Sequence, residues 1–212
     1  MALDQRSKPN EGSSASLPGI LFGLAVLSSL VVIWTTVLPM IDGAAWPRHA
    51  GHLPLILTHV TGGVSMVVLG AIALFIGWTR RLFRWHRWFG RAYLVLGSMA
   101  AILVFALGAV APHDPKSLYI ATDTLAFTWL AVAAMGWHAA RNGRFASHRE
   151  WMIRSYVLSW TFVGCRLATM IDFYPWLGSE GLTAAVWVNW IVPLVVCEIA
   201  LRWRDGSSRL AR

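Results

Sequence analysis

Runs of about 20 apolar residues recur along the chain and leave few folds open to it. A helix rises about 1.5 Å per residue, so a run of this length crosses the roughly 30 Å hydrocarbon core of a bilayer. The composition agrees, because 57% of the residues are hydrophobic and only 13% are charged. We therefore expect an all-α, multi-pass integral membrane protein whose surroundings are the lipid bilayer.

Six apolar runs are predicted to be transmembrane helices. They form one domain over residues 19–203, between a polar, Ser-rich tail at 1–18 that is predicted to be disordered and a short basic tail at 204–212. The second to fifth spans are expected to form the functional core, and the first and sixth to flank it. The predicted spans are Gly19–Met40, Leu53–Trp78, Gly90–Ala111, Leu118–Ala140, Glu150–Ile171 and Leu182–Trp203.

The positive charges are distributed unevenly about these spans. Of the 18 lysines and arginines, all but Arg48, Lys116 and Arg166 lie in the two tails or in two turns, one after the second span and one after the fourth. Lys and Arg in short loops are retained on the cytoplasmic side. Both termini and both basic turns are therefore predicted to be cytoplasmic. The net charge of +8 reflects this topology and contact with anionic lipid head groups, so no nucleic-acid partner is expected.

The two basic turns resemble each other in sequence. Residues 77–93 read GWTRRLFRWHRWFGRAY, and residues 136–156 read GWHAARNGRFASHREWMIRSY. Gly-Trp, a basic turn, His-Arg, Trp, Arg and Tyr recur in that order, although the second turn is longer. We interpret the two stretches as a weak internal repeat of a helix-turn-helix unit. Two similar histidine-bearing turns would then lie on one membrane face.

His86 and His148 hold equivalent positions in this repeat, each at the cytoplasmic start of a span. If the third and fifth spans are neighbours, both imidazoles face one gap. Bis-histidine ligation of a b-type haem needs two imidazoles on facing helices, with cations nearby for the propionates. The alternative is that these histidines only contact lipid head groups. The candidate haem ligands are His86 and His148, with His138 as a competitor, and the candidate cations are Arg84, Arg87, Arg149 and Arg154.

A second candidate site lies on the opposite side of the membrane. His59 is the deepest histidine, and Gly62, Gly63, Met66 and Gly70 follow it on the same helical face. Such a glycine-lined slot could hold a planar macrocycle, with the imidazole as an axial ligand. Alternatively, the glycines let a neighbouring helix pack closely, and His59 forms a hydrogen bond across that contact.

Two charged residues are predicted to lie within spans. Arg166 lies at a depth comparable to that of His59, where an unpaired guanidinium costs at least about 2.5 kcal/mol. It either forms a structural ion pair, for which Asp123 and Asp172 are candidates, or lines a site for an anionic or carbonyl-bearing ligand. Glu198 is predicted to pair with Arg202 one helical turn later.

Several of these elements resemble a known family. THVTGG in the second span, HRWFGRAYLVLG at the third, HREWMIRSY at the fifth and Arg166 are similar to a bacterial family of predicted multi-spanning membrane proteins, domain of unknown function 2306. The resemblance covers about His52 to Arg166. It implies a multi-pass protein of the bacterial inner membrane and brings no established activity.

A weaker similarity is to cytochrome b561 proteins, which are six-span bundles with histidine-ligated haems. In those proteins a histidine at the start of a span is followed by glycines, as His86 is followed here by Gly90 and Gly97. The present chain departs from their pattern because its fourth span has no histidine in the outer half. This departure favours a single haem over a two-haem path across the membrane.

Three functions therefore stand as hypotheses. The first is a b-type haem protein that exchanges electrons with a quinol or a redox partner. The second is a non-redox accessory or structural subunit of a membrane complex. The third is a small-molecule transporter or intramembrane enzyme that uses the region of His59, Arg166 and Asp123. Sequence motifs for nucleotide hydrolysis, zinc proteolysis, serine hydrolysis and dithiol chemistry are absent from the chain.

Overall fold

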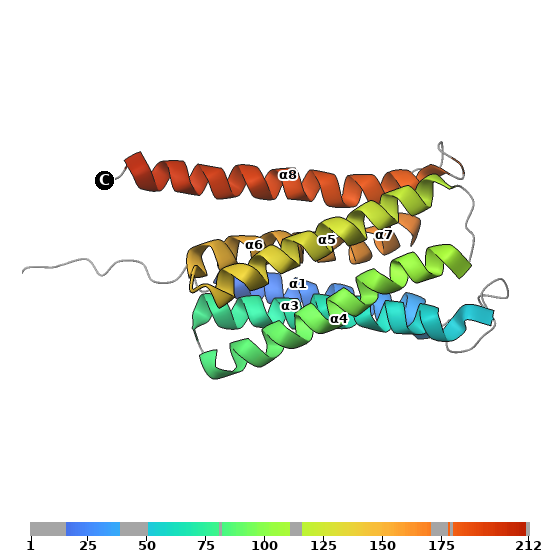
Figure 1. Ribbon diagram of the computed structural model, residues 1–212, viewed down its shortest axis with the longest axis horizontal. Helices are drawn as coiled ribbons and strands as arrows, with labels where there is room; N and C mark the ends of the chain where they lie inside the picture. Colours follow the sequence, from blue (N-terminus) through green and yellow to red (C-terminus); the bar gives the residue numbers. More distant parts are fainter. Residues whose placement is uncertain are drawn as a thin grey trace, which may run out of the picture.

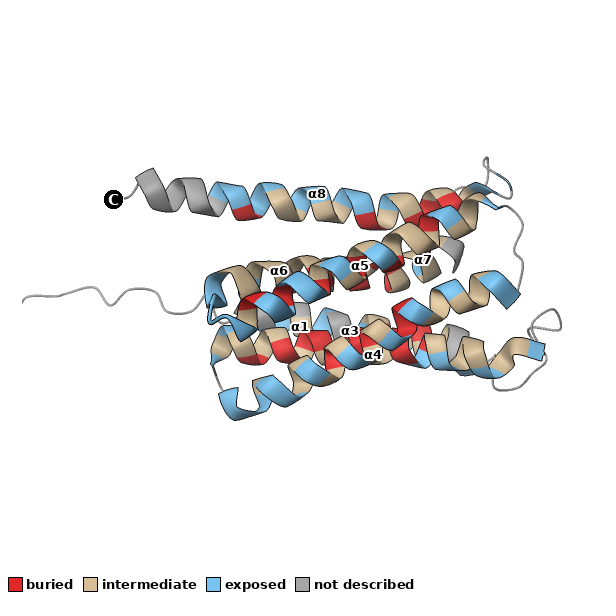
Figure 2. Ribbon diagram, viewed as in Figure 1, coloured by how far each residue is buried: buried red, intermediate tan, exposed pale blue. Residues whose placement is uncertain are grey.

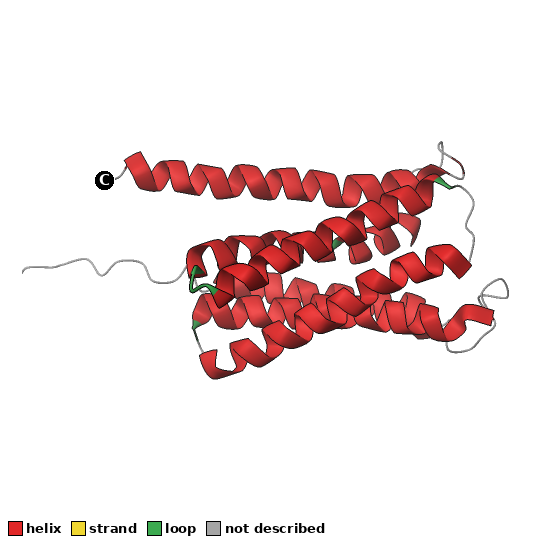
Figure 3. Cartoon of the chain, in the orientation of Figure 1, coloured by secondary structure: helices red, strands yellow, loops and turns green. Residues whose placement is uncertain are grey.

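The computed structural model is a bundle of long helices. It describes residues 16–38, 51–80, 82–110, 116–170, 178 and 180–210, and these residues contain no β-strand (Figure 3). The all-α prediction is therefore confirmed. The elements are α1 (Ser16–Val32), the π-helical η1 (Ile33–Val37), α3 (Leu53–Thr79), α4 (Phe83–Val110), α5 (Ser117–Arg141), α6 (Phe145–Ser159), α7 (Thr161–Met170) and α8 (Gly181–Leu210).

Four of the described helices are long and apolar enough to cross a membrane. They are α3, α4, α5 and the Gly181–Trp203 part of α8. The first predicted span corresponds to α1 followed by η1, and the fifth is divided into α6 and α7 at Trp160. The structure thus supports a membrane protein with four candidate spans in its described part. The count of six spans and the cytoplasmic position of both termini stay predictions.

The boundaries of α3 and α5 fall close to the predicted ones, whereas α4 begins at Phe83 instead of Gly90. Arg and Trp side chains are compatible with a helix, so the helix continues beyond the apolar run into the basic segment. His86 therefore lies in the first turns of a regular helix and not in a loop. At the other end of the chain, α8 continues past the predicted boundary at Trp203 to Leu210.

Both basic turns are short and reverse the chain with left-handed residues. Arg80 ends α3 with φ of 54°, and Leu82 follows with φ of 56°. In the second turn Gly143 has φ of 71°, a conformation that glycine adopts without a Cβ clash. The Arg144 amide donates to the carbonyl of Ala139 at 2.9 Å and closes that turn. Each turn thereby packs the second helix of its unit against the first.

Four of the elements form a ring around a common axis. α3 packs against α4, α4 against α5, α5 against α6, and α6 against α3, so α4 and α6 are diagonal to each other. α1 packs mainly on α3, while α8 packs on α5, α6 and α7 (Figure 1). This arrangement agrees with a core of the second to fifth predicted spans and two flanking helices. The two basic turns lie at the same end of the bundle (Figure 1).

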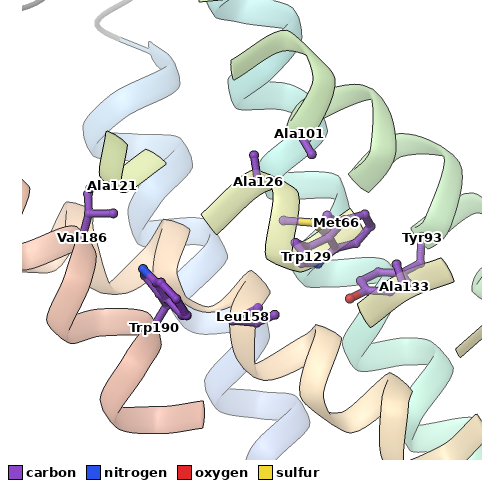
Figure 4. Packing of buried hydrophobic residues seen from close by; sticks show 10 residues of the cluster. All are labelled: Met66, Tyr93, Ala101, Ala121, Ala126, Trp129, Ala133, Leu158, Val186 and Trp190. Atoms are coloured by element: carbon purple, nitrogen blue, oxygen red, sulfur yellow. The ribbon is translucent and has the colours of Figure 1, made fainter. Parts of the chain in front are cut away.

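The buried residues lie on the faces of the ring that point inward (Figure 2). Met66, Tyr93 and Trp129 are at the centre of the largest apolar cluster, with Tyr93 only 1% and Trp129 only 3% exposed (Figure 4). The outward faces carry large apolar side chains that are exposed in the isolated chain, among them Val95, Ile102 and Phe127. An apolar exterior around a packed interior is the surface that a bilayer requires.

Candidate functional site

His86 and His148 are both fixed by backbone carbonyl groups. Nδ1 of His86 lies 3.0 Å from the carbonyl oxygen of Ala73, and Nδ1 of His148 lies 2.9 Å from that of Gly136. A carbonyl oxygen only accepts hydrogen bonds, so each Nδ1 carries the proton and donates it. In the neutral rings Nε2 is then left with its lone pair, which is the state of an imidazole that binds a metal.

The two imidazoles meet across the bundle. Their ring centroids are 6.4 Å apart, and their planes are perpendicular, at 90°. Because α4 and α6 are diagonal, the pair lies between the other two helices of the ring, α3 and α5. The structure thus brings together the two histidines that the repeat singled out, at the end of the bundle that carries both basic turns (Figure 1).

In the two units of the repeat, the histidines occupy equivalent places in the structure, whereas the Gly-Trp pairs do not. In both units the histidine of the second helix donates to a carbonyl of the first helix. In the second unit this carbonyl belongs to Gly136 itself, whereas in the first it belongs to Ala73, which precedes Gly77 by four residues (73 to 77). The connections 80–82 and 142–144 are equally long, so the three extra residues between Gly136 and His148 lie in α5 and shift the Gly-Trp pair by about one helical turn.

The neighbouring helices present small residues to the pair. A Cβ added at Gly77 would lie 3.2 Å from Cε1 of His86, and one added at Gly136 would lie 2.8 Å from Sδ of Met152. A Cβ at Gly90, one turn after His86, would have no other atom within 4 Å. Phe83 stacks on the His86 ring with centroids 5.3 Å apart. The surroundings are thus two small residues, an open position and one flexible methionine.

Three of the four candidate cations are exposed at this end, namely Arg84, Arg87 and Arg149. Arg87 and Arg149 each follow directly on one histidine of the pair. Both arginines therefore lie at the end of the bundle that carries the two basic turns. An anionic group bound beside the histidine pair would need positive charges at this end.

Arg154, the fourth candidate cation, lies in an ion pair. Its Nε and Nη2 both lie 2.9 Å from Oε2 of Glu198 on α8, and its Nη1 lies 3.8 Å from Glu150. The guanidinium is thus committed to an ion pair that joins α6 to α8. Glu198 also accepts from Nε of Arg202 at 3.1 Å, so the predicted pairing of these two residues is confirmed.

His138 takes no part in the pair. It is exposed near the end of α5, and the side-chain amide of Asn142 donates to its Nε2 at 2.9 Å and to its backbone carbonyl at 3.0 Å. This arrangement caps the last turn of α5 and occupies the nitrogen that a metal would need.

His59 lies in a close helix contact. Its Nδ1 is 2.9 Å from the carbonyl oxygen of Ala100 on α4, and a Cβ at Gly62 would lie 3.0 Å from Cβ of Ala100. The ring of Phe162 covers Gly63 at 3.0 Å, and the rings of Tyr156 and Tyr93 cover Gly70. The slot predicted for a planar macrocycle is therefore filled by side chains of the protein. The contacts of His59 match the alternative of close helix packing.

Arg166 on α7 is half-buried and lies within electrostatic range of His59, as their predicted depths implied. Of its two candidate partners, Asp123 has a buried Oδ1 without a hydrogen-bond partner among the described residues. Asp172 lies outside the described residues.

A buried polar cluster was missed by the sequence analysis. The hydroxyl of Tyr93 lies 2.9 Å from Oγ of Ser155 and 3.0 Å from Oγ of Ser159, and Nε1 of Trp129 donates to Oγ of Ser159 at 3.0 Å. Tyr93 and Ser155 each follow a histidine of the pair by seven residues (86 to 93 and 148 to 155) and so lie about two turns deeper on the same helix faces. That shared spacing is the signal that could have revealed the cluster.

Together these features define an all-helical integral membrane protein with a histidine pair at its cationic end. The chain belongs to the family described as predicted membrane protein, DUF2306, whose model matches residues 56–201. The match includes both basic turns and confirms the family resemblance. No curated protein and no solved structure matches the chain. The similarity to cytochrome b561 proteins still rests on His86, Gly90 and Gly97 alone.

Proposed function

We propose that the chain binds one b-type haem between His86 and His148 and exchanges electrons with a quinol or a redox protein at the cytoplasmic face of the bacterial inner membrane. The observation that carries this proposal is the 6.4 Å separation of the two imidazole rings, both of which are fixed at Nδ1.

The separation discriminates between metal geometries. With metal–nitrogen bonds of about 2.0 Å, two imidazoles on opposite sides of one ion have ring centroids about 6.3 Å apart, whereas in a tetrahedral site they are only about 5.1 Å apart. The observed 6.4 Å is close to the first value, which supports the proposal that one metal ion lies between the two rings.

Two axial imidazoles leave four equatorial positions for other ligands. Among the described residues there is no group of three or more His, Cys, Asp and Glu side chains that could hold a metal ion. A porphyrin supplies four equatorial nitrogens without help from the protein, so haem is the cofactor that two histidines alone can complete.

Space for such a group would have to come from two neighbours of the pair. The position at Gly90 is open, and Met152, which packs on Gly136, can change rotamer because its side chain is unbranched. Gly77 is already covered by the His86 ring. Arg87 and Arg149 supply exposed cations next to the two ligands, where propionates would lie.

The contribution of the chain to the chemistry follows from these contacts. A bound haem supplies the one-electron redox couple. The carbonyls of Ala73 and Gly136 accept from Nδ1 of both imidazoles, which would leave Nε2 to bind the iron and fixes the ring planes. The diagonal helices α4 and α6 would present the two ligands from opposite sides, and the arginines would favour an anionic cofactor at this end.

The test is a reduced-minus-oxidised visible spectrum of the full chain, purified in mild detergent from cells supplied with a haem precursor. A pyridine haemochrome assay gives the stoichiometry. We expect a b-type spectrum with one haem per chain. A folded, colourless protein that also fails to take up added haemin would overturn the proposal and favour the accessory-subunit alternative.

A further inference from the structure

We propose that Tyr93 is a positioning residue that sets the distance between α4 and α6, and with it the separation of His86 and His148. The effect of Tyr93 on haem binding rests on the proposed function. The effect of Tyr93 on the distance between α4 and α6 does not depend on it.

Tyr93 joins the two diagonal helices directly. Its hydroxyl, on α4, lies within hydrogen-bond distance of both Ser155 and Ser159 on α6, at 2.9 and 3.0 Å. All three residues are at most 1% exposed. Diagonal helices in a ring of four have little other contact with each other, so two buried hydrogen bonds have a large share in fixing their spacing.

The two serines that face Tyr93 also form hydrogen bonds within α6. Oγ of Ser155 donates to the carbonyl of Met152 at 3.1 Å, and Oγ of Ser159 donates to the carbonyl of Ser155 at 2.9 Å. Tyr93 has one hydroxyl proton, so it donates to one serine, and its bond to the other serine forms when that serine donates to the phenol oxygen instead of to its carbonyl. Oγ of Ser159 also accepts from the indole of Trp129.

Its position makes Tyr93 relevant to the histidines. Tyr93 and Ser155 lie about two turns, or about 10 Å along the helix axes, below His86 and His148. A change in the α4–α6 distance at this depth is carried along two rigid helices to the pair.

The chain contains a matched control. Tyr156 ends the second unit as Tyr93 ends the first, although it follows its histidine by eight residues instead of seven. A Cβ at Gly70 would meet both rings, at 2.6 Å for Tyr156 and 2.9 Å for Tyr93. The buried Tyr156 hydroxyl has no hydrogen bond to α4, and its neighbour is Trp160, four residues later, with ring centroids 6.4 Å apart. Removing the Tyr156 hydroxyl takes away the same atom without breaking a link between α4 and α6.

The experiment measures the helix distance by pulsed electron paramagnetic resonance (EPR). Spin labels are placed at Trp88→Cys on α4 and Ala146→Cys on α6, both exposed, in a full chain with Cys165→Ala and Cys197→Ala. For Tyr93→Phe we expect a longer and broader distance distribution, and for Tyr156→Phe a distribution that coincides with that of the parent. The double variant Ser155→Ala with Ser159→Ala should reproduce the effect of Tyr93→Phe. It replaces Tyr93→Phe in the experiment if that variant folds poorly. Coincidence of all three distributions, or equal shifts in the two tyrosine variants, would overturn the proposal.

The haem midpoint potential is a second readout, which a general loss of stability would not move. It should shift in Tyr93→Phe and stay unchanged in Tyr156→Phe; equal potentials in the two variants would contradict the positioning role. If the chain binds no haem, the distance measurement still decides the role of Tyr93, so failure of the proposed function and failure of this inference are distinguishable.

Discussion

Trp129 of α5 and Gly97 of α4 are in such close contact that the indole takes the space a side chain at position 97 would need. A Cβ at Gly97 would also lie 3.0 Å from Sδ of Met66 on α3. The same indole donates to Ser159 on α6. One residue thus packs three helices together and completes the polar cluster beneath the histidine pair.

Gly97→Ala is therefore expected to destabilise the protein. The added methyl group must displace the Trp129 ring, and overpacking of this kind costs about 1–3 kcal/mol. The measurement is the thermal midpoint in detergent, which should fall. Gly23→Ala is the control, because a Cβ at Gly23 has nothing within 4 Å. Equal midpoints for the two variants would contradict the tight contact.

Glu198→Gln should loosen α8 from α6. The carboxylate accepts from Arg154 on α6, which is only 15% exposed, and from Arg202 on its own helix, which is 81% exposed. Loss of the inner bond should lower stability by about 1–2 kcal/mol, given that Glu198 is partly exposed. Arg202→Gln removes only the exposed bond and should have little effect on the thermal midpoint. A similar decrease of the thermal midpoint in both variants would show that the Arg154–Glu198 pair contributes no more to stability than the exposed Arg202–Glu198 pair.

His86→Ala and His148→Ala are each expected to abolish haem binding while the chain still inserts in the membrane. Either change removes one axial ligand of a site that has only two. His138→Ala should keep the full haem content, because Nε2 of His138 is held by Asn142. Haem per chain is measured against the amount of membrane-inserted protein. Full haem in both of the first two variants would exclude this ligand pair.

His59→Leu is expected to lower the thermal midpoint and leave the visible spectrum unchanged. The variant loses the hydrogen bond to Ala100 between α3 and α4, worth about 1 kcal/mol. Bleaching of the haem bands in this variant would show that His59 is a ligand and that the contact with Ala100 is not its main role.

The sequence predicted the fold best where the ends of helices are marked by residue type. Pro54 in the first turn of α3 and the turn after Thr79 place that helix to within a residue. The start of α4 was predicted late because hydropathy does not show that an arginine-rich segment continues a helix. The division at Trp160 was missed because no Gly or Pro marks it. There Thr161 donates to the carbonyl of Asn189 on α8, a contact that only the packed bundle creates.

For the candidate site, the sequence predicted which histidines meet but not what holds them. The repeat paired His86 with His148, and the spacing of Glu198 and Arg202 predicted their ion pair. The carbonyls of Ala73 and Gly136 could not be found in this way, since any residue has one. The ion pair of Arg154 could not be predicted because its partner Glu198 is 44 residues away in the chain.

The most direct test of the central claim is the EPR spectrum of the ferric protein. Two axial imidazoles make the iron low-spin, and perpendicular ring planes, as at His86 and His148, make the signal strongly anisotropic because two of the iron d orbitals stay close in energy. We predict this low-spin, strongly anisotropic signal for the wild type, with conversion to high-spin when either histidine is replaced and some haem is retained. A high-spin signal in the wild type, or a folded chain without haem, would contradict the assignment.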